Sequence, residues 1–172
     1  MDGFSVKLSH PTQRQHRRLL PPRPSSAIVT GAFHLKGCRV TNEWEDAVRR
    51  GSIDQLQRLL ASGADIDARD GHGQTALMLA AREGHAKVVE WLVDHGAALD
   101  HTAKYSLSAL MLAVIGGRSD AVRILAAAGA NLCLRGTGAP GFTAKTALDL
   151  AIARRDPDMV EILRAHAVRR PK

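Results

Sequence analysis

Aromatic residues are scarce in this chain: they make up 3% of its 172 residues, although the hydrophobic fraction is 45%. That apolar content is enough for the core of one ordinary domain. The core must therefore be built from Ala, Leu, Val and Ile, and such a composition suits closely packed helices.

Cysteines and long apolar runs are also lacking. The only two cysteines, Cys38 and Cys133, supply neither a disulfide framework nor the spacing of a metal site. The sequence contains no apolar run of about 18 residues or more and no recognisable secretory signal segment. We therefore expect a soluble, cytoplasmic protein that does not contact a membrane.

Most of the chain carries almost no net charge, although the formal net charge of the whole sequence is +7. Residues 1–40 account for +6, from seven basic residues and one acidic residue, and the remainder carries +1, from 17 bases and 16 acids. Beyond this N-terminal segment, the sequence therefore does not indicate a basic stripe that could follow nucleic-acid phosphates.

Residues 1–40 show no helical or strand periodicity, and residues 21–26 read Pro-Pro-Arg-Pro-Ser-Ser. Such a composition does not offset the entropy of ordering, so we predict a disordered basic tail. An organelle-targeting peptide is one interpretation, because the segment contains Arg and few acids, but prolines interrupt its candidate helices. A linker and a mis-assigned start codon are the alternatives. Residues 168–172 are expected to form a short basic C-terminal tail.

A 33-residue repeat organises the rest of the chain. Two sets of glycines recur at this interval: Gly51, Gly84 and Gly117, then Gly63, Gly96 and Gly129. The triplet Thr75-Ala-Leu recurs one period later as Ser108-Ala-Leu, and Thr146-Ala-Leu follows after a longer interval (146 − 108 = 38). We therefore expect tandem structural units with a five-residue insertion within residues 135–145.

Each unit predicts two short helices. Thr75, Ser108 and Thr146 precede apolar runs, where a hydroxyl can cap the free N–H groups of a helix start. A glycine such as Gly84 can end this helix in a left-handed conformation. A second amphipathic helix and an extended loop complete the unit. In the first unit we expect Asn42 to be the helix cap, with a glutamate three residues later.

The sequence Gly-His-Gly-Gln-Thr-Ala-Leu-Met-Leu-Ala-Ala-Arg-Glu-Gly-His at residues 71–85 and Gly-Ala-Asp-Ile-Asp at 63–67 resemble the ankyrin repeat. The resemblance covers about residues 41–167. It implies an all-α solenoid of about four helix-turn-helix units joined by extended hairpin loops. The units would span about residues 41–69, 70–102, 103–140 and 141–167. The resemblance also implies a non-catalytic module that binds another protein.

The chain departs from that family pattern at several positions. Met78, Met111 and Asp149 replace the usual histidine, which removes a side chain that normally ties adjacent loops together. Ser106 stands where a loop glycine is usual. We therefore expect the loops to be less firmly ordered than in the family.

A glycine-rich segment suggests a phosphate site. Gly136, Gly138 and Gly141 form a G-x-G-x-x-G pattern, but a P-loop requires glycine where Ala139 and Ala144 stand. We expect an extended, mobile insertion in one hairpin loop and no bound nucleotide.

The histidines and Cys133 do not form a recognisable site. The histidines His72, His85, His95 and His101 fall at unrelated positions of the repeat, which favours structural or solvated roles over a metal site. Cys133 is expected to be a buried, inert thiol. No catalytic residue, cofactor, metal or small-molecule substrate is therefore predicted.

In ankyrin proteins the partner usually touches the hairpin tips, the residue before the capping Thr and the two residues before the turn glycine. These positions form a strip on the concave face of the loops and inner helices. We call it the concave strip; the predicted contact residues are Arg49, Arg50, His72, Gln74, Arg82, Glu83, Lys104, Tyr105, Leu107, Ile115, Phe142, Lys145 and Arg154. The remaining positions of this register are Gly71, Gly116, Thr143 and Ala153.

The chemistry of the concave strip predicts its partner. Apolar anchors at Tyr105, Leu107, Ile115 and Phe142 within a basic rim suit an acidic, partly apolar protein segment. As an alternative, Leu107 and Ile115 pack against adjacent loops and the arginines are ordinary solvated side chains. Two other functions stay open: a nucleic-acid-associated adaptor that uses the basic N-terminal tail, and a regulatory or scaffold subunit of a larger complex. We expect a monomer.

Overall fold

The computed structural model describes residues 37–138, 141 and 143–168. These residues form eight α-helices and one short 3-10 helix, and no strand occurs among them. The predictions for the N-terminal tail, Phe142 and the C-terminal tail beyond residue 168 lie outside the described residues.

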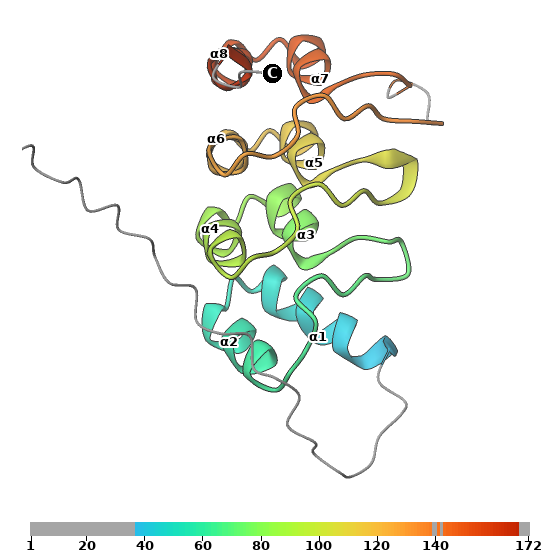
Figure 1. The fold of residues 1–172 in the computed structure, drawn as a ribbon, viewed down its shortest axis with the longest axis vertical. Helices are drawn as coiled ribbons and strands as arrows, with labels where there is room; N and C mark the ends of the chain where they lie inside the picture. Colours follow the sequence, from blue (N-terminus) through green and yellow to red (C-terminus); the bar gives the residue numbers. More distant parts are fainter. Residues whose placement is uncertain (1–36, 139–140, 142, 169–172) are drawn as a thin grey trace, which may run out of the picture. The chain divides into compact units, whose positions relative to one another are not determined.

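The helices are arranged as four helix-turn-helix units, as the repeat predicts (Figure 1). The units are α1 (Gly37–Arg49) with α2 (Ile53–Ala61), α3 (Ala76–Glu83) with α4 (Ala86–Asp94), α5 (Ala109–Gly116) with α6 (Ser119–Ala127), and α7 (Ala147–Arg154) with α8 (Pro157–Val168). The inner helices α1, α3, α5 and α7 pack in one row, and the outer helices α4, α6 and α8 pack in a second row. Long hairpin loops extend from the inner row between successive units.

The first unit differs from its prediction. Helix α1 begins at Gly37, so Asn42 lies within the helix and cannot cap its start. The predicted domain boundary at about residue 41 likewise falls inside α1. The physical reason is that residues 38–41 contain neither proline nor glycine, so nothing in them stops the helix from extending toward Gly37.

The predicted caps of the other inner helices are confirmed. Thr75 and Ser108 each accept the backbone N–H of the residue three positions later at 3.4 Å, and Thr146 does so at 3.3 Å. Gly84 and Gly117 end α3 and α5 in the left-handed conformation, with φ of 87° and 71°. The repeat markers therefore set both ends of α3 and α5 and the start of α7.

Asp149 completes a capping box at the start of α7. Its Oδ2 accepts the backbone N–H of Thr146 at 2.9 Å and the Thr146 hydroxyl at 2.8 Å. These two hydrogen bonds hold the pKa of the Asp149 carboxyl below its ordinary value. The carboxylate form therefore stabilises the helix start at neutral pH, and this contribution is lost as the pH falls through the lowered pKa.

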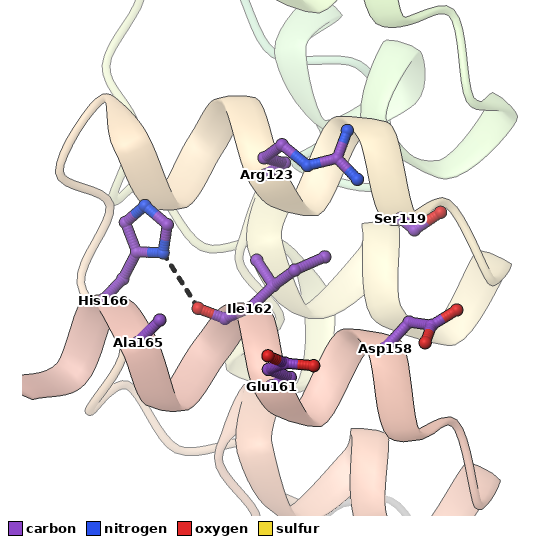
Figure 2. Close-up of a pocket in the computed structure, with 7 residues that line it drawn as sticks. All are labelled: Ser119, Arg123, Asp158, Glu161, Ile162, Ala165 and His166. Atoms are coloured by element: carbon purple, nitrogen blue, oxygen red, sulfur yellow. Dashed lines mark hydrogen bonds between the residues drawn. The ribbon is translucent and has the colours of Figure 1, made fainter.

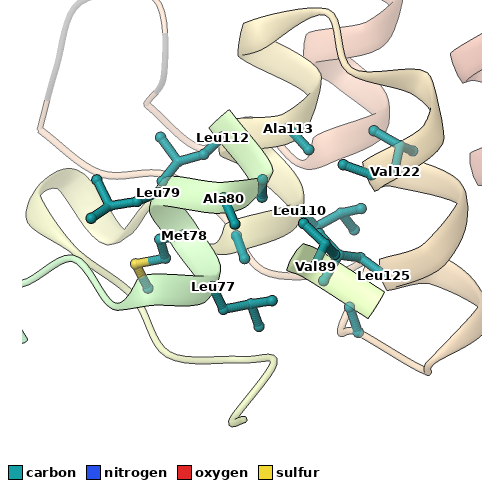
Figure 3. Packing of buried hydrophobic residues seen from close by; sticks show 14 of the residues in the cluster. Leu77, Met78, Leu79, Ala80, Val89, Leu110, Leu112, Ala113, Val122 and Leu125 are labelled. Carbon is teal, nitrogen blue, oxygen red and sulfur yellow. The ribbon is translucent and has the colours of Figure 1, made fainter. Parts of the chain in front are cut away.

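Small apolar residues allow the units to pack closely. Ala80 of α3 and Ala113 of α5 are fully buried among leucines and valines of the neighbouring helices (Figure 3). Met78 and Met111, which occupy the usual histidine position, are each 1% exposed. These methionines are therefore part of the core and do not tie the loops together.

The hairpin loops share one closing hydrogen bond. The N–H of Asp70 donates to the Gln74 carbonyl at 2.9 Å. In the same way, Ala103 donates to Leu107 and Gly136 donates to Lys145, each at 3.0 Å. The paired residues are four apart in the first two loops and nine apart in the third (145 − 136). The five-residue insertion therefore falls between Gly136 and Lys145, within the predicted interval.

Backbone contacts join adjacent loops. Lys104 donates its N–H to the His72 carbonyl at 3.4 Å, and Thr137 donates its N–H to the Tyr105 carbonyl at 2.7 Å. The hydroxyl oxygens of Ser106 and Thr137 are 2.9 Å apart. The loops are thus connected by groups other than the histidine that the family usually supplies.

The absence of a glycine at Ser106 leaves backbone strain. Ser106 has a φ of 55°, and its counterpart one period earlier, Gly73, has a φ of 75°. We expect Ser106→Gly to raise the free energy of unfolding by about 1 kcal/mol relative to Ser106→Ala, because both remove the hydroxyl and only Gly relieves the strain. Gly73→Ser should lower it by a similar amount. Urea denaturation measures all three; a Ser106→Gly variant no more stable than Ser106→Ala contradicts the assignment.

Candidate functional site

The structure places the concave strip on the hairpin loops and on the C-terminal ends of the inner helices. His72 and Gln74 lie in the first loop, and Lys104, Tyr105 and Leu107 in the second. Lys145 closes the third loop. The helix ends contribute Arg49 and Arg50 at α1, Arg82 and Glu83 at α3, Ile115 at α5 and Arg154 at α7. Phe142 lies outside the described residues.

Tyr105 is the most prominent apolar group of this strip. Its side chain is 41% exposed. The ammonium group of Lys104 lies 5.1 Å from the ring centroid, which is a cation–π distance. A Cβ atom built on Gly138 would lie 3.6 Å from Cδ1 of the ring, so the third loop borders the ring on one side.

Leu107 and Ile115 are less available. Both are half-buried and pack against the hydrophobic core. The structure therefore supports the alternative interpretation of these two residues, as packing side chains between loops and helices. Among the described residues, Tyr105 is left as the exposed apolar anchor.

The arginines of the strip make contacts within the stack. Arg82 donates to Oε1 of Gln74 at 3.2 Å and pairs with Oε1 of Glu83 at 3.3 Å. Arg49 pairs with Glu45 at 3.4 Å. Exposed pairs of this kind contribute about 0–1 kcal/mol to the stability of the fold, so an incoming carboxylate can replace them at little cost in free energy.

Arg154 has a structural contact that the sequence did not predict. Its Nη1 donates to the carbonyl of Ile115 at 2.8 Å. In the preceding unit, Nε of Arg118 donates to the carbonyl of Arg82 at 3.3 Å. The two acceptor carbonyls are one period apart (115 − 82) and lie at the C-terminal ends of α5 and α3. Each of them accepts a hydrogen bond from an arginine of the next unit.

Gly116 marks the closest approach of two inner helices. A Cβ atom at this position would lie 2.6 Å from the Arg82 carbonyl oxygen. Gly116 is therefore a spacing residue between α3 and α5, in addition to its place in the register of the strip. The sequence signal for it is the pair Gly116-Gly117, because the helix cap requires only the second glycine.

Apart from the concave strip, a depression of about 420 Å³ lies on the outer row, between α6 and α8 (Figure 2). Its lining residues are Ser119, Arg123, Asp158, Glu161, Ile162, Ala165 and His166. Arg123 is held by Asp120 at 3.0 Å, and the His166 ring bonds the Ile162 carbonyl at 2.8 Å. The cation and the ring thus bond within their own helices, and these lining residues form no nucleophile–base pair.

The predicted histidine positions are dispersed. His95 stacks on Trp91 with ring centroids 4.0 Å apart, and His101 contacts Arg69 at 2.8 Å. His72 is exposed at a loop tip, and His85 lies beside the Gly51 turn. Among the described residues, no group of three or more His, Cys, Asp or Glu is placed to hold a metal ion.

The prediction that Cys133 is buried was wrong, because its side chain is exposed. The equivalent residues of the two earlier units are Asp67 and Asp100, which stand at the same turn. Their carboxylates accept a backbone N–H of the following unit at 2.9 and 2.7 Å. This turn position lies at the edge of the stack, where the family pattern carries a polar side chain. A small apolar residue type does not make such a position part of the core.

None of the helices in the described part of the chain is long and apolar enough to cross a membrane.

A family model of ankyrin repeats (3 copies) matches residues 45–136. Similar proteins include ankyrin repeat domain-containing protein 29 of Homo sapiens, 52% identical over 44 residues, and that of Danio rerio, 48% identical over 44 residues. Each match covers 25% of this chain and 15% of the relative. A Rickettsia felis protein named as a putative ankyrin repeat protein is 43% identical over 44 residues, covering 26% of this chain and 70% of the relative.

The close approach at Gly116 predicts an unusual response to alanine. Alanine normally stabilises a helix relative to glycine, but at this position its Cβ meets a backbone oxygen. We expect Gly116→Ala to lower the free energy of unfolding by about 1–3 kcal/mol. Gly71→Ala is the matched control, because nothing lies within 4 Å of its Cβ position. Thermal and urea unfolding measure both; a Gly116→Ala variant as stable as the wild type contradicts the spacing role.

Proposed function

The chain belongs to the ankyrin repeat family, and from that membership we propose that it is a binding module whose partner lies across the concave strip. Ankyrin repeats are generally protein–protein interaction modules. We propose further that the partner is an acidic, partly apolar protein segment.

The exposed ring of Tyr105 is the observation that carries this proposal. Its backbone is left-handed, with a φ of 65°, which is unfavourable for a bulky residue. The hydrogen bond from Thr137 to the Tyr105 carbonyl helps to hold this conformation. Strained residues of this kind cluster at binding sites, and an aromatic side chain in a held position is a favourable binding anchor.

Charge around Tyr105 supports an acidic partner. Lys104 is exposed beside the ring, and Arg82 lies at the end of α3 in the same strip. Arg50 is exposed at the end of the first inner helix, whereas Glu83 is the only acidic residue among the predicted contacts. A carboxylate-bearing segment would therefore meet complementary charge beside the ring and along the preceding units of the strip.

A peptide-binding experiment tests the proposal. A random-peptide display library is selected against the wild-type protein, and we expect enrichment of sequences that combine Asp or Glu with Leu or Phe. Lys104→Glu/Tyr105→Asn should weaken binding of the enriched peptides at least about tenfold, because it reverses a charge and removes the anchor. Asn is chosen at residue 105 because it tolerates the left-handed backbone.

Lys87→Glu is the charge-matched control. Lys87 is exposed on α4 of the outer row, away from the hairpin loops. The proposal requires this variant to bind as the wild type does. Enriched peptides without acidic residues, or equal binding by the double variant, would contradict it.

A further inference from the structure

The last unit exposes positions that the preceding units bury. Ile152 of α7 is 50% exposed, whereas its counterparts Val114 and Ala81 are 0% exposed. These counterparts are the equivalent positions of the two preceding units, once the loop insertion is allowed for. Among the described residues no inner helix follows α7, so we infer from the difference in exposure that this position faces the next inner helix in α3 and α5.

Helix α8 shows the same change. Ser119 and Arg123 of α6 line the depression between α6 and α8, and Val122 and Ala126 of the same helix are buried. Their counterparts in the last unit are Pro157, Val160, Glu161 and Arg164. Together with Ala165, these four line an open groove of about 520 Å³. The exposed surface of the last unit is thus the continuation of the interface that joins one unit to the next.

At the opposite end of the stack, the side chains that the structure describes as exposed are mainly polar. Among the described side chains of α1 and α2, the exposed ones are Asn42, Glu43, Asp46, Arg49, Asp54, Gln57, Arg58 and Ala61. All but the last are polar. A head-to-tail arrangement would therefore place the apolar surface of α7 and α8 against charged residues, which is unfavourable.

We propose that a second copy of this chain covers the exposed surface, in a two-fold symmetric dimer that joins the last units of two stacks. We call this surface the end face; it comprises Ile152 of α7 with Pro157, Val160, Glu161 and Arg164 of α8. This proposal differs from the monomer expected from the sequence, and it does not depend on the proposed function.

Charge on the end face favours the symmetric arrangement. Glu161 and Arg164 lie three positions apart along one side of α8 and carry opposite charges, and both border the groove. A two-fold axis that crosses α8 between them brings Glu161 of each copy against Arg164 of the other. The end face is thereby complementary to itself, as a two-fold interface requires.

Sedimentation equilibrium of the full chain tests the dimer. We expect the wild type to change from monomer to dimer as its concentration rises through the micromolar range. Ile152→Glu should weaken the dimer at least about tenfold, because each interface then buries two carboxylates. Ala153→Glu is the matched control: Ala153 is exposed on the same helix but belongs to the concave strip register, so dimerisation should be unchanged.

Charge reversal supplies a second test that leaves the apolar contacts intact. Glu161→Arg and Arg164→Glu should each weaken the dimer, and the two together should restore it, because the opposite charges again meet across the axis. Circular dichroism confirms that each variant is folded. A wild type that stays monomeric up to about millimolar concentration, or a dimer unaffected by Ile152→Glu, overturns the proposal. Peptide binding at the concave strip is measured separately and does not depend on either result.

Discussion

The close packing of one inner helix on the next is the interaction on which the rest of this structure depends. Buried alanines such as Ala80 and Ala113 let the helices approach, and at Gly116 the approach leaves no room for a Cβ atom beside the Arg82 carbonyl. This spacing also sets the distance between successive hairpin loops. It brings each loop close enough to bond its neighbour, and it lets an arginine of the next unit reach the end of the preceding inner helix.

Much of the fold could be predicted from the sequence because each repeat marker has a local physical role. The hydroxyls of Thr75, Ser108 and Thr146 and the glycines at helix ends act within a few residues of themselves, so their positions indicate helix boundaries directly. The insertion was also located by spacing alone. Asn42 failed as a cap because a favourable cap residue does not by itself stop a helix, and α1 begins upstream at Gly37.

The candidate site was less predictable, because exposure depends on neighbours that the register does not describe. Leu107 and Ile115 occupy contact positions of the family but pack inward. Cys133 has a residue type common in cores but stands at a surface turn. The contacts of Arg118 and Arg154 reach into the preceding unit, so they depend on packing between units and have no local signal.

Two surfaces with different chemistry result from the same stack. The concave strip combines one held aromatic ring with positive charge, whereas the end face is an uncovered repeat junction with paired opposite charges. A dimer through the end face would leave both concave strips free, and a partner with two acidic segments could then bind with greater avidity than a single strip provides.

The central claim is that the partner contacts the hairpin loops and inner-helix ends. Amide hydrogen exchange, measured with and without a library-selected acidic peptide, tests this claim most directly. The account predicts slower exchange in the loop segments 70–74 and 103–107 and at the C-terminal ends of α3 and α5, with unchanged exchange in the outer helices α4 and α6. Protection confined to α4, α6 or the groove between α6 and α8 would contradict it.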